Sequence, residues 1–208
     1  MNVFLNRCVQ ESMMPSREKL VYKHRYERDS FAILSPGGVA ALPPAAREEA
    51  SMSRNGLSLR TTVDTDPKLK ASTPPVIARI VKIRLVDLDI YSPLTNFDTR
   101  ISVNIEVDLH NRDDIDTSLL TIPAEQEKER RPDRHKNRLS YTHLSCYSID
   151  LTQVTNTDTG AKTHELEVEV DAVRLRQQAV LLQQDKPSAF AAMVSGLLND
   201  VKLLMAQA

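Results

Sequence analysis

Charged side chains recur at every second position in three short segments between residues 134 and 171. Ordered along the chain, these positions hold Arg134, Lys136, Arg138, Ser140, Asp150, Thr152, Glu165, Glu167 and Glu169. The first segment is cationic and the last is acidic. Because successive side chains of a β-strand point to opposite faces, each row would lie on one face of a sheet. The pattern predicts a sheet with one ionic face and one apolar face.

The acidic row would need cations if it were enclosed. Alternate residues of a strand are about 6.8 Å apart, so neighbouring glutamates repel by about 0.6 kcal/mol in water and about 2.4 kcal/mol at an effective dielectric constant of 20. Carboxylate oxygens suit Mg²⁺ or Mn²⁺, and a row of Arg and Lys suits a polyphosphate. Inside a closed barrel, both rows could support in-line attack of water on a phosphoryl group. The alternative is a solvated face with ordinary cross-strand ion pairs.

Other catalytic patterns are absent from the sequence. The five glycines form neither GxxxxGK[ST] nor GxGxxG, so no backbone phosphate loop is expected. The five histidines show neither HExxH nor another paired spacing that would indicate zinc. Neither Cys8 nor Cys146 is followed six residues later by arginine, which argues against a cysteine phosphatase.

Composition favours one globular domain over residues 1–208. The chain is 41% hydrophobic and 26% charged, which is sufficient for a single core. Lys plus Arg number 27 and Asp plus Glu 28, so a nucleic acid would have to be held by a local basic patch. Two cysteines are too few for a disulfide framework, and no apolar run approaches the roughly 20 residues of a membrane span. We expect an intracellular protein without a membrane partner.

The elements that would position the charged rows follow from the periodicity. The sequence predicts a short helix over 3–13 and extended segments over 20–34, 57–63, 76–91 and 98–108. Residues 134–171 should form a meander with a hairpin turn at 156–162. The Pro-, Gly- and Ala-rich stretch 35–55 is predicted to be a disordered insertion, and 188–207 a C-terminal surface helix. The expected fold class is α+β, mainly antiparallel β, with flanking helices.

Five blocks occur in fixed order: RLVDLDIYSP, FDTRISVNIEVD, RHKNRLSYTH, YSIDLTQV and THELEVEVD. Together they strongly resemble the fungal RNA 5′-triphosphatases, the β subunits of yeast-type mRNA-capping enzymes. That family belongs to the triphosphate tunnel metalloenzymes, whose antiparallel strands close into a barrel with an ionic interior. The resemblance implies a nuclear polynucleotide 5′-phosphatase that removes the γ-phosphate from the 5′ end of nascent mRNA, using Mg²⁺ or Mn²⁺, before capping. It also implies a guanylyltransferase partner, the capping enzyme α subunit, and homodimerisation.

The same resemblance implies roles for individual residues. Glu169 is expected to bind the metal ion directly, with Glu167 and Glu165 as companions that hold water or orient cations. Asp150 and Thr152 are expected to line the tunnel beside them. The expected phosphate-binding cations are Arg100, Arg134, Lys136 and Arg138. For each cation taken singly, a surface salt bridge is the alternative.

One family feature is missing from this sequence. Family members begin with a strand of the ExExK type whose two glutamates complete the metal site, and no such strand is found near Met1. We therefore expect a truncated chain that lacks one barrel strand and is catalytically incomplete. Two alternatives stay open: a non-catalytic scaffold subunit of the capping complex, and a hydrolase of small triphosphates with the same tunnel.

Overall fold

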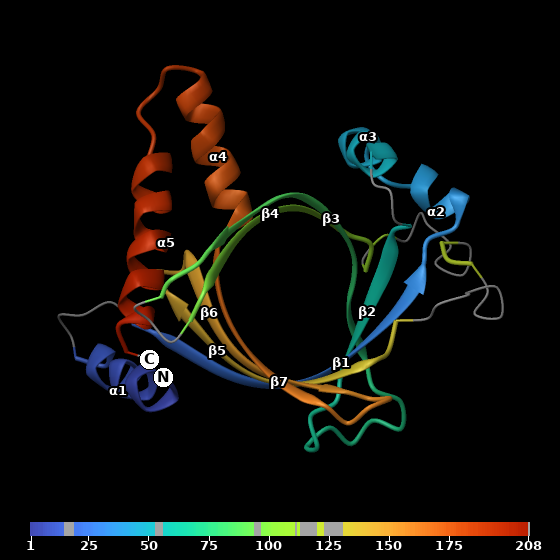
Figure 1. The fold of residues 1–208 in the computed structure, drawn as a ribbon, viewed down its shortest axis with the longest axis horizontal. Coiled ribbons are helices and arrows are strands. Elements are labelled where there is room, and N and C mark those ends of the chain that lie inside the picture. The colour runs from blue at the N-terminus through green and yellow to red at the C-terminus, as the bar shows by residue number, and fades with distance from the viewer. Residues whose placement is uncertain are drawn as a thin grey trace.

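Seven strands form one antiparallel sheet that curves around a common axis (Figure 1). The computed structural model describes residues 1–14, 19–52, 56–93, 97–110, 112, 120–122 and 131–207. The order across the sheet is β4-β3-β2-β1-β5-β6-β7, so β4 and β7 are its two edges. The strands are β1 Val21–Ile33, β2 Ser58–Asp64, β3 Val76–Ile90, β4 Thr99–Asp108, β5 Arg134–His143, β6 Tyr147–Asn156 and β7 Lys162–Val170. The predicted class, an antiparallel barrel-like sheet with flanking helices, is confirmed.

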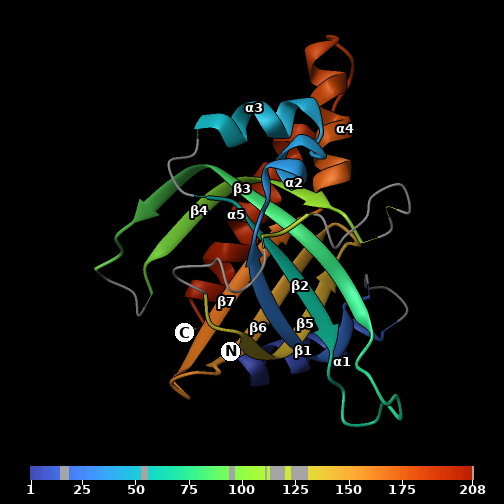
Figure 2. The same ribbon diagram turned by 90° about the vertical axis from the view of Figure 1, so that its right-hand side faces the viewer.

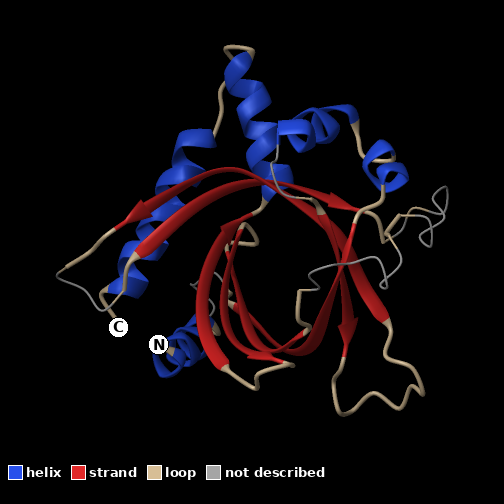
Figure 3. Cartoon of the chain, turned by 45° about the vertical axis from the view of Figure 1, so that its right-hand side comes forward, coloured by secondary structure: helices blue, strands red, loops and turns tan. Residues whose placement is uncertain are grey.

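The helices all lie outside the curve of the sheet (Figure 3). Helices α2 and α3 lie over the β3 side, while α4 and α5 form a pair that packs beside β7 (Figures 1 and 2). The helices are α1 Asn2–Ser12, α2 Pro36–Ala40, α3 Pro44–Met52, α4 Ala172–Gln183 and α5 Phe190–Met205. Among the described residues, none of these helices is long and apolar enough to cross a membrane.

The prediction of a disordered insertion at 35–55 is wrong for residues 35–52, and residues 53–55 lie outside the described residues. This stretch forms α2 and α3, and it supplies Leu42 and Ala46 to the main core, each 2% exposed. Ser35 caps α2 by accepting a hydrogen bond from the Gly38 amide at 3.0 Å. Alanine is the strongest helix former, and its small side chain lets α3 approach the sheet closely. The alanine-rich composition of this stretch therefore reflects helices packed closely on the sheet, not disorder.

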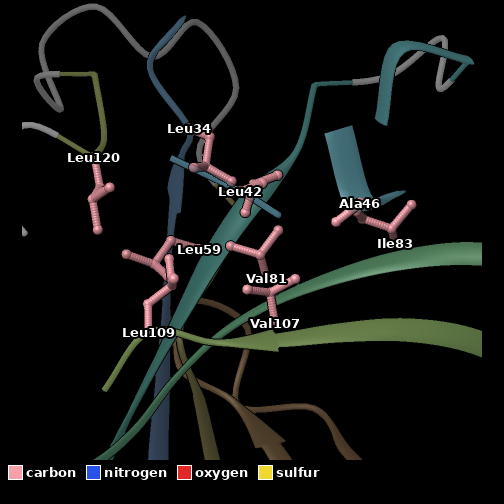
Figure 4. Packing of buried hydrophobic residues seen from close by; sticks show 9 residues of the cluster. All are labelled: Leu34, Leu42, Ala46, Leu59, Val81, Ile83, Val107, Leu109 and Leu120. Atoms are coloured by element: carbon pink, nitrogen blue, oxygen red, sulfur yellow. The ribbon is translucent and has the colours of Figure 1, made fainter. Parts of the chain in front are cut away.

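The main core fills the space between α2, α3 and the outer faces of β2, β3 and β4. Figure 4 shows its nine members: Leu34, Leu42, Ala46, Leu59, Val81, Ile83, Val107, Leu109 and Leu120. Since Val81 and Ile83 point outward to the helices, the alternate residues of β3 point into the curve of the sheet.

A second core lies under α1, on the outer faces of β5 and β6. Leu5 of α1 packs there with Tyr141, Ile149 and Leu204. The hydroxyl oxygen of the fully buried Tyr141 lies within hydrogen-bond distance of the side-chain oxygens of Asn2 and Asn6, at 2.8 and 2.9 Å. The apolar faces of these strands therefore point outward, and their ionic faces point inward.

Candidate functional site

The strand register brings the predicted charged rows together on the inner face of the sheet. One row across β1, β5, β6 and β7 consists of Arg25, Arg138, Thr152 and Glu165. The next row consists of Lys23, Ser140, Asp150 and Glu167. The meander predicted for residues 134–171 thus places the cationic strand β5 and the acidic strand β7 on either side of β6.

A tight turn fixes the register of the acidic strand. Asn156 accepts backbone hydrogen bonds from Asp158 and Thr159 at 2.9 and 3.0 Å, which folds the chain back after β6. Gly160 has φ of 69°, a left-handed conformation that glycine adopts without strain. Because a slip of one residue would turn every glutamate of β7 outward, this turn is essential to the site.

Lys136 is held in a buried ion pair with a carboxylate of β1. Its Nζ lies 2.6 Å from Oδ2 of Asp29, and the two side chains are 8% and 2% exposed. Thr62 of β2 donates to the other Asp29 oxygen at 2.7 Å. Burial opposes ionisation of Asp29, but the Lys136 ammonium and these hydrogen bonds outweigh it, so the pKa of Asp29 is lowered. Lys136 is thereby fixed in one position on the inner face.

Arg138 joins three strands. Its Nη1 donates to Oδ2 of Asp150 at 2.8 Å, and its Nε lies 3.7 Å from a carboxylate oxygen of Glu27. Burial disfavours the charged guanidinium, but Glu27, Asp150 and the β7 glutamates outweigh this effect and raise its pKa. Arg138 therefore stays charged beside the acidic row.

Two buried oxygen atoms next to Arg138 lack a hydrogen-bond partner among the described residues. They are Oδ1 of Asp150 and Oγ1 of Thr152. Thr152 is only 2% exposed. A buried polar atom without a partner costs about 1–3 kcal/mol, so such atoms commonly mark a place for water or a ligand. Asp150 and Thr152 face the same side as Glu165 and Glu167, where an additional polar group would meet them.

The acidic row faces residues from the opposite part of the sheet. The Glu169 side chain is exposed to the hollow of the sheet. Desolvation by the surrounding strands raises the pKa of Glu169, and the carboxylates of Glu167, Glu106 and Asp150 raise it further, while Lys82 lowers it. Lys82 and Glu106 belong to β3 and β4, and they form an ion pair at 3.1 Å. β7 and β4 are opposite edges of the sheet, so this coupling requires the sheet to curl and bring them face to face.

The acidic row suits a divalent ion in the kind of atoms it offers. Within the described ranges, no three His, Cys, Asp or Glu side chains are gathered closely enough to hold a metal ion by themselves. Mg²⁺ commonly binds through one or two carboxylates and completes its shell with waters and substrate phosphates. Glu169 and Glu167 fit that role, because their mutual repulsion leaves the site short of positive charge.

Two predicted cations lie apart from the ion pairs of Lys136 and Arg138. The guanidinium of Arg134 stacks 5.1 Å from the ring of Phe31, at the end of the inner face. Arg100 on β4 forms an exposed ion pair with Asp89 at 2.6 Å, and this hydrogen bond raises the pKa of Arg100. For Arg100 the structure thus shows the alternative considered for each cation, a surface salt bridge. By the alternation along β4, Arg100 shares the inward face of that strand with Glu106 but lies six residues away from it.

Four charged residues of β1, β3 and β4 near the site were not predicted from the sequence. Glu27, Asp29, Lys82 and Glu106 all contact or influence the predicted site residues. A signal was present in β1, where Lys23, Arg25, Glu27 and Asp29 alternate with the same period of two. The charge of these four residues changes from positive to negative along the strand, so the row was not recognised as a site of one charge.

The fold and inner face together define a curled antiparallel sheet whose concave face carries a cationic row on β5 and an acidic row on β7. Residues 1–208 match the family described as mRNA capping enzyme, beta chain. The chain belongs to this family.

Relatives and solved structures agree with this assignment. The mRNA-capping enzyme subunit beta of Schizosaccharomyces pombe is 27% identical over 208 residues, covering 98% of this chain and 57% of the relative. The structure of the S. pombe Pct1 RNA triphosphatase superposes with a TM-score of 0.68 at 25% identity, covering 98% of this chain and 65% of that one. The same protein in complex with the Spt5 CTD gives a TM-score of 0.70 at 24% identity, with the same coverage. This chain therefore spans less than two thirds of their length.

Proposed function

We propose that this chain forms the tunnel of an RNA 5′-triphosphatase, which hydrolyses the γ-phosphate of a 5′-triphosphate RNA end to leave a diphosphate. The observation that carries the proposal is the strand register, which gathers Arg138, Asp150 and Glu167 on the concave face of the sheet, with Arg138 fixed by its hydrogen bond to Asp150. An anionic polyphosphate would meet cations on one side and a metal-binding acidic row on the other. Family membership and the likeness to an RNA triphosphatase support RNA as the substrate.

The residues of the inner face have three different roles in the proposed reaction. Lys136, Arg138 and Arg134 bind and orient the phosphate oxygens, and their fixed positions avoid reorganisation during the reaction. Asp29 and Glu27 hold two of these cations in place. Glu169 and Glu167 would hold Mg²⁺ or Mn²⁺, which neutralises charge on the transferred phosphoryl group. Asp150, Thr152 and Glu165 present oxygens that can orient the attacking water.

Phosphate release from 5′-triphosphate RNA in the presence of Mg²⁺ or Mn²⁺ tests the proposal in the full-length protein. Glu169→Ala should lose at least about 100-fold in rate, since electrostatic groups of this kind contribute on that scale. Mn²⁺ should raise the unfolding temperature of the wild type but not of Glu169→Ala. Arg174→Ala, an exposed change on α4, is the matched control and should behave as wild type. Full activity of Glu169→Ala would refute the site.

We further propose partners and a location for this chain. The S. pombe relative was solved with the Spt5 CTD, and the family is named for the β chain of the capping enzyme, which supports assembly with a guanylyltransferase during transcription in the nucleus. Homodimerisation is proposed as an expectation for members of this family. Co-purification with the guanylyltransferase and sedimentation of the full-length protein test these two assemblies.

A further inference from the structure

The outer face of β1, β5, β6 and β7 carries two adjacent polar rows that the tunnel does not use. The register places Arg28, His135, Thr155 and Lys162 side by side in the first row. The second row, about 6.8 Å further along the strands, consists of Tyr26, Asn137, Gln153 and His164. Neither row contains a carboxylate.

The first row is cationic and uncompensated. Arg28, His135 and Lys162 are exposed, and Arg28 and Lys162 form no ion pair among the described residues. Every residue of these four strands is described, and their outward faces contain no Asp or Glu. The chain as a whole has a net charge of −1, so this row is a local basic strip. Such a strip attracts an anionic chain.

The second row presents aromatic and amide groups in an ordered arrangement. Nε2 of His24 lies 2.6 Å from Oδ1 of Asn137, and the His24 ring lies 4.5 Å from that of Tyr26. On the other side, Nε2 of Gln153 lies 3.1 Å from Nε2 of His164. Both amides are thus oriented by a histidine. A shallow pocket is lined by Tyr26, His135, Asn137, Gln153 and Thr155, among others.

The part of this face toward α1 is already covered. The neighbouring residues Leu139 and Leu151 pack against the core under α1. The two polar rows lie beyond that core, and the cationic row is the last one before the β6–β7 turn. We call these two rows, from Arg28 to Lys162 and from Tyr26 to His164, the platform. The platform therefore borders one open end of the curled sheet.

We propose that these two rows bind single-stranded RNA, with phosphates on the cationic row and bases on the Tyr26–Asn137–Gln153–His164 row. A strip of cations beside stackable aromatic and hydrogen-bonding side chains is the combination that single-stranded nucleic acids require. A folded protein partner would instead need a continuous apolar centre, which these rows lack. The inference deepens the proposed function, because it assigns a place to the transcript beyond its 5′ end.

Binding of a 5′-hydroxyl single-stranded RNA to the full-length protein tests the platform, because this RNA has no triphosphate for the tunnel. Tyr26→Ala should weaken binding at least about fivefold at every salt concentration, the loss expected of one stacked base. Arg28→Ala/Lys162→Ala should also weaken binding, and should reduce the slope of log affinity against log salt by about 1.4. The charge-matched control Arg174→Ala/Lys202→Ala, on α4 and α5, should change neither quantity.

The outcomes separate this inference from the proposed function. Glu169→Ala should bind the 5′-hydroxyl RNA as the wild type does. Unchanged RNA affinity in Tyr26→Ala and in Arg28→Ala/Lys162→Ala would overturn the platform and leave the phosphatase proposal standing. Displacement of the RNA by an acidic peptide of equal charge at equal concentration would also overturn it, since the face would then recognise charge alone. Intact platform binding without phosphate release would overturn only the proposed function.

Discussion

Asp29 stabilises the site through Lys136. The pair is buried, so each charge has exchanged water for the other and for the Thr62 hydroxyl. Such a pair adds little net stability compared with apolar residues, but breaking it leaves an uncompensated buried charge. Asp29 is therefore a positioning residue, which keeps an ammonium at a fixed place on the inner face.

Asp29→Asn should lower the free energy of unfolding by about 3–5 kcal/mol at neutral pH, because Lys136 would remain buried without its counter-charge. Since the pKa of Asp29 is lowered in the folded state, its contribution is present above the unfolded-state value of about 3.9 and is lost as the pH falls through the folded-state value. The difference between wild type and variant should thus shrink in acid.

Urea denaturation at several pH values measures this difference. Glu48→Gln, an exposed change on α3, is the control and should alter stability by less than about 0.5 kcal/mol. A loss in Asp29→Asn no larger than that of the control would show that Lys136 does not depend on this carboxylate.

At the scale of elements, α2 depends on a close approach to the chain around Leu120. A Cβ atom on Gly38 would lie 2.2 Å from the backbone oxygen of Leu120 and 2.5 Å from a side-chain carbon of Leu34. The backbone at Leu120 cannot easily move away, because its carbonyl oxygen accepts a hydrogen bond from the Ser35 amide at 2.8 Å. Glycine at this position allows α2 to pack against the main core.

Gly38→Ala should therefore destabilise the protein by about 1–3 kcal/mol, the usual cost of overpacking. Gly56→Ala is the matched control, because its Cβ would meet only a side-chain carbon of Ile33 at 3.7 Å. That change should be neutral or stabilise by up to about 1 kcal/mol. Thermal unfolding of both variants is the measurement, and equal effects would contradict the packing described for α2.

The strands were predictable from sequence, and several helices were not. Strict alternation in β4 and in β5 to β7 follows directly from one buried and one polar face, so the periodicity located these elements. Residues 35–52 have few large apolar side chains, and their burial depends on Val81 and Ile83, which are distant in sequence. Helix α4 has no fully buried residue, so its apolar pattern gave no signal, although Asp171 caps it by accepting from the Arg174 amide at 2.8 Å.

At the scale of the whole molecule, the curl of the sheet creates the site. The sequence predicted the acidic and cationic rows, because each row alternates with a period of two within one continuous meander, β5 to β7. It did not predict that Lys82 and Glu106 would influence Glu169, because that proximity depends on how far seven strands curl. For Arg100 the strand was predicted correctly, but the ion pair of its guanidinium with Asp89 on the neighbouring strand β3 was not.

The pKa of the Glu169 carboxyl, measured by NMR titration in the wild type and in Lys82→Met, tests most directly whether the two edges of the sheet enclose one ionic space. In the wild type it should lie above the ordinary glutamate value of about 4.3. Removing the Lys82 ammonium should raise it further, because that charge now favours the ionised carboxylate. An ordinary pKa that does not change in Lys82→Met would contradict the account, since the glutamates of β7 would then lie beyond the electrostatic reach of β3 and β4.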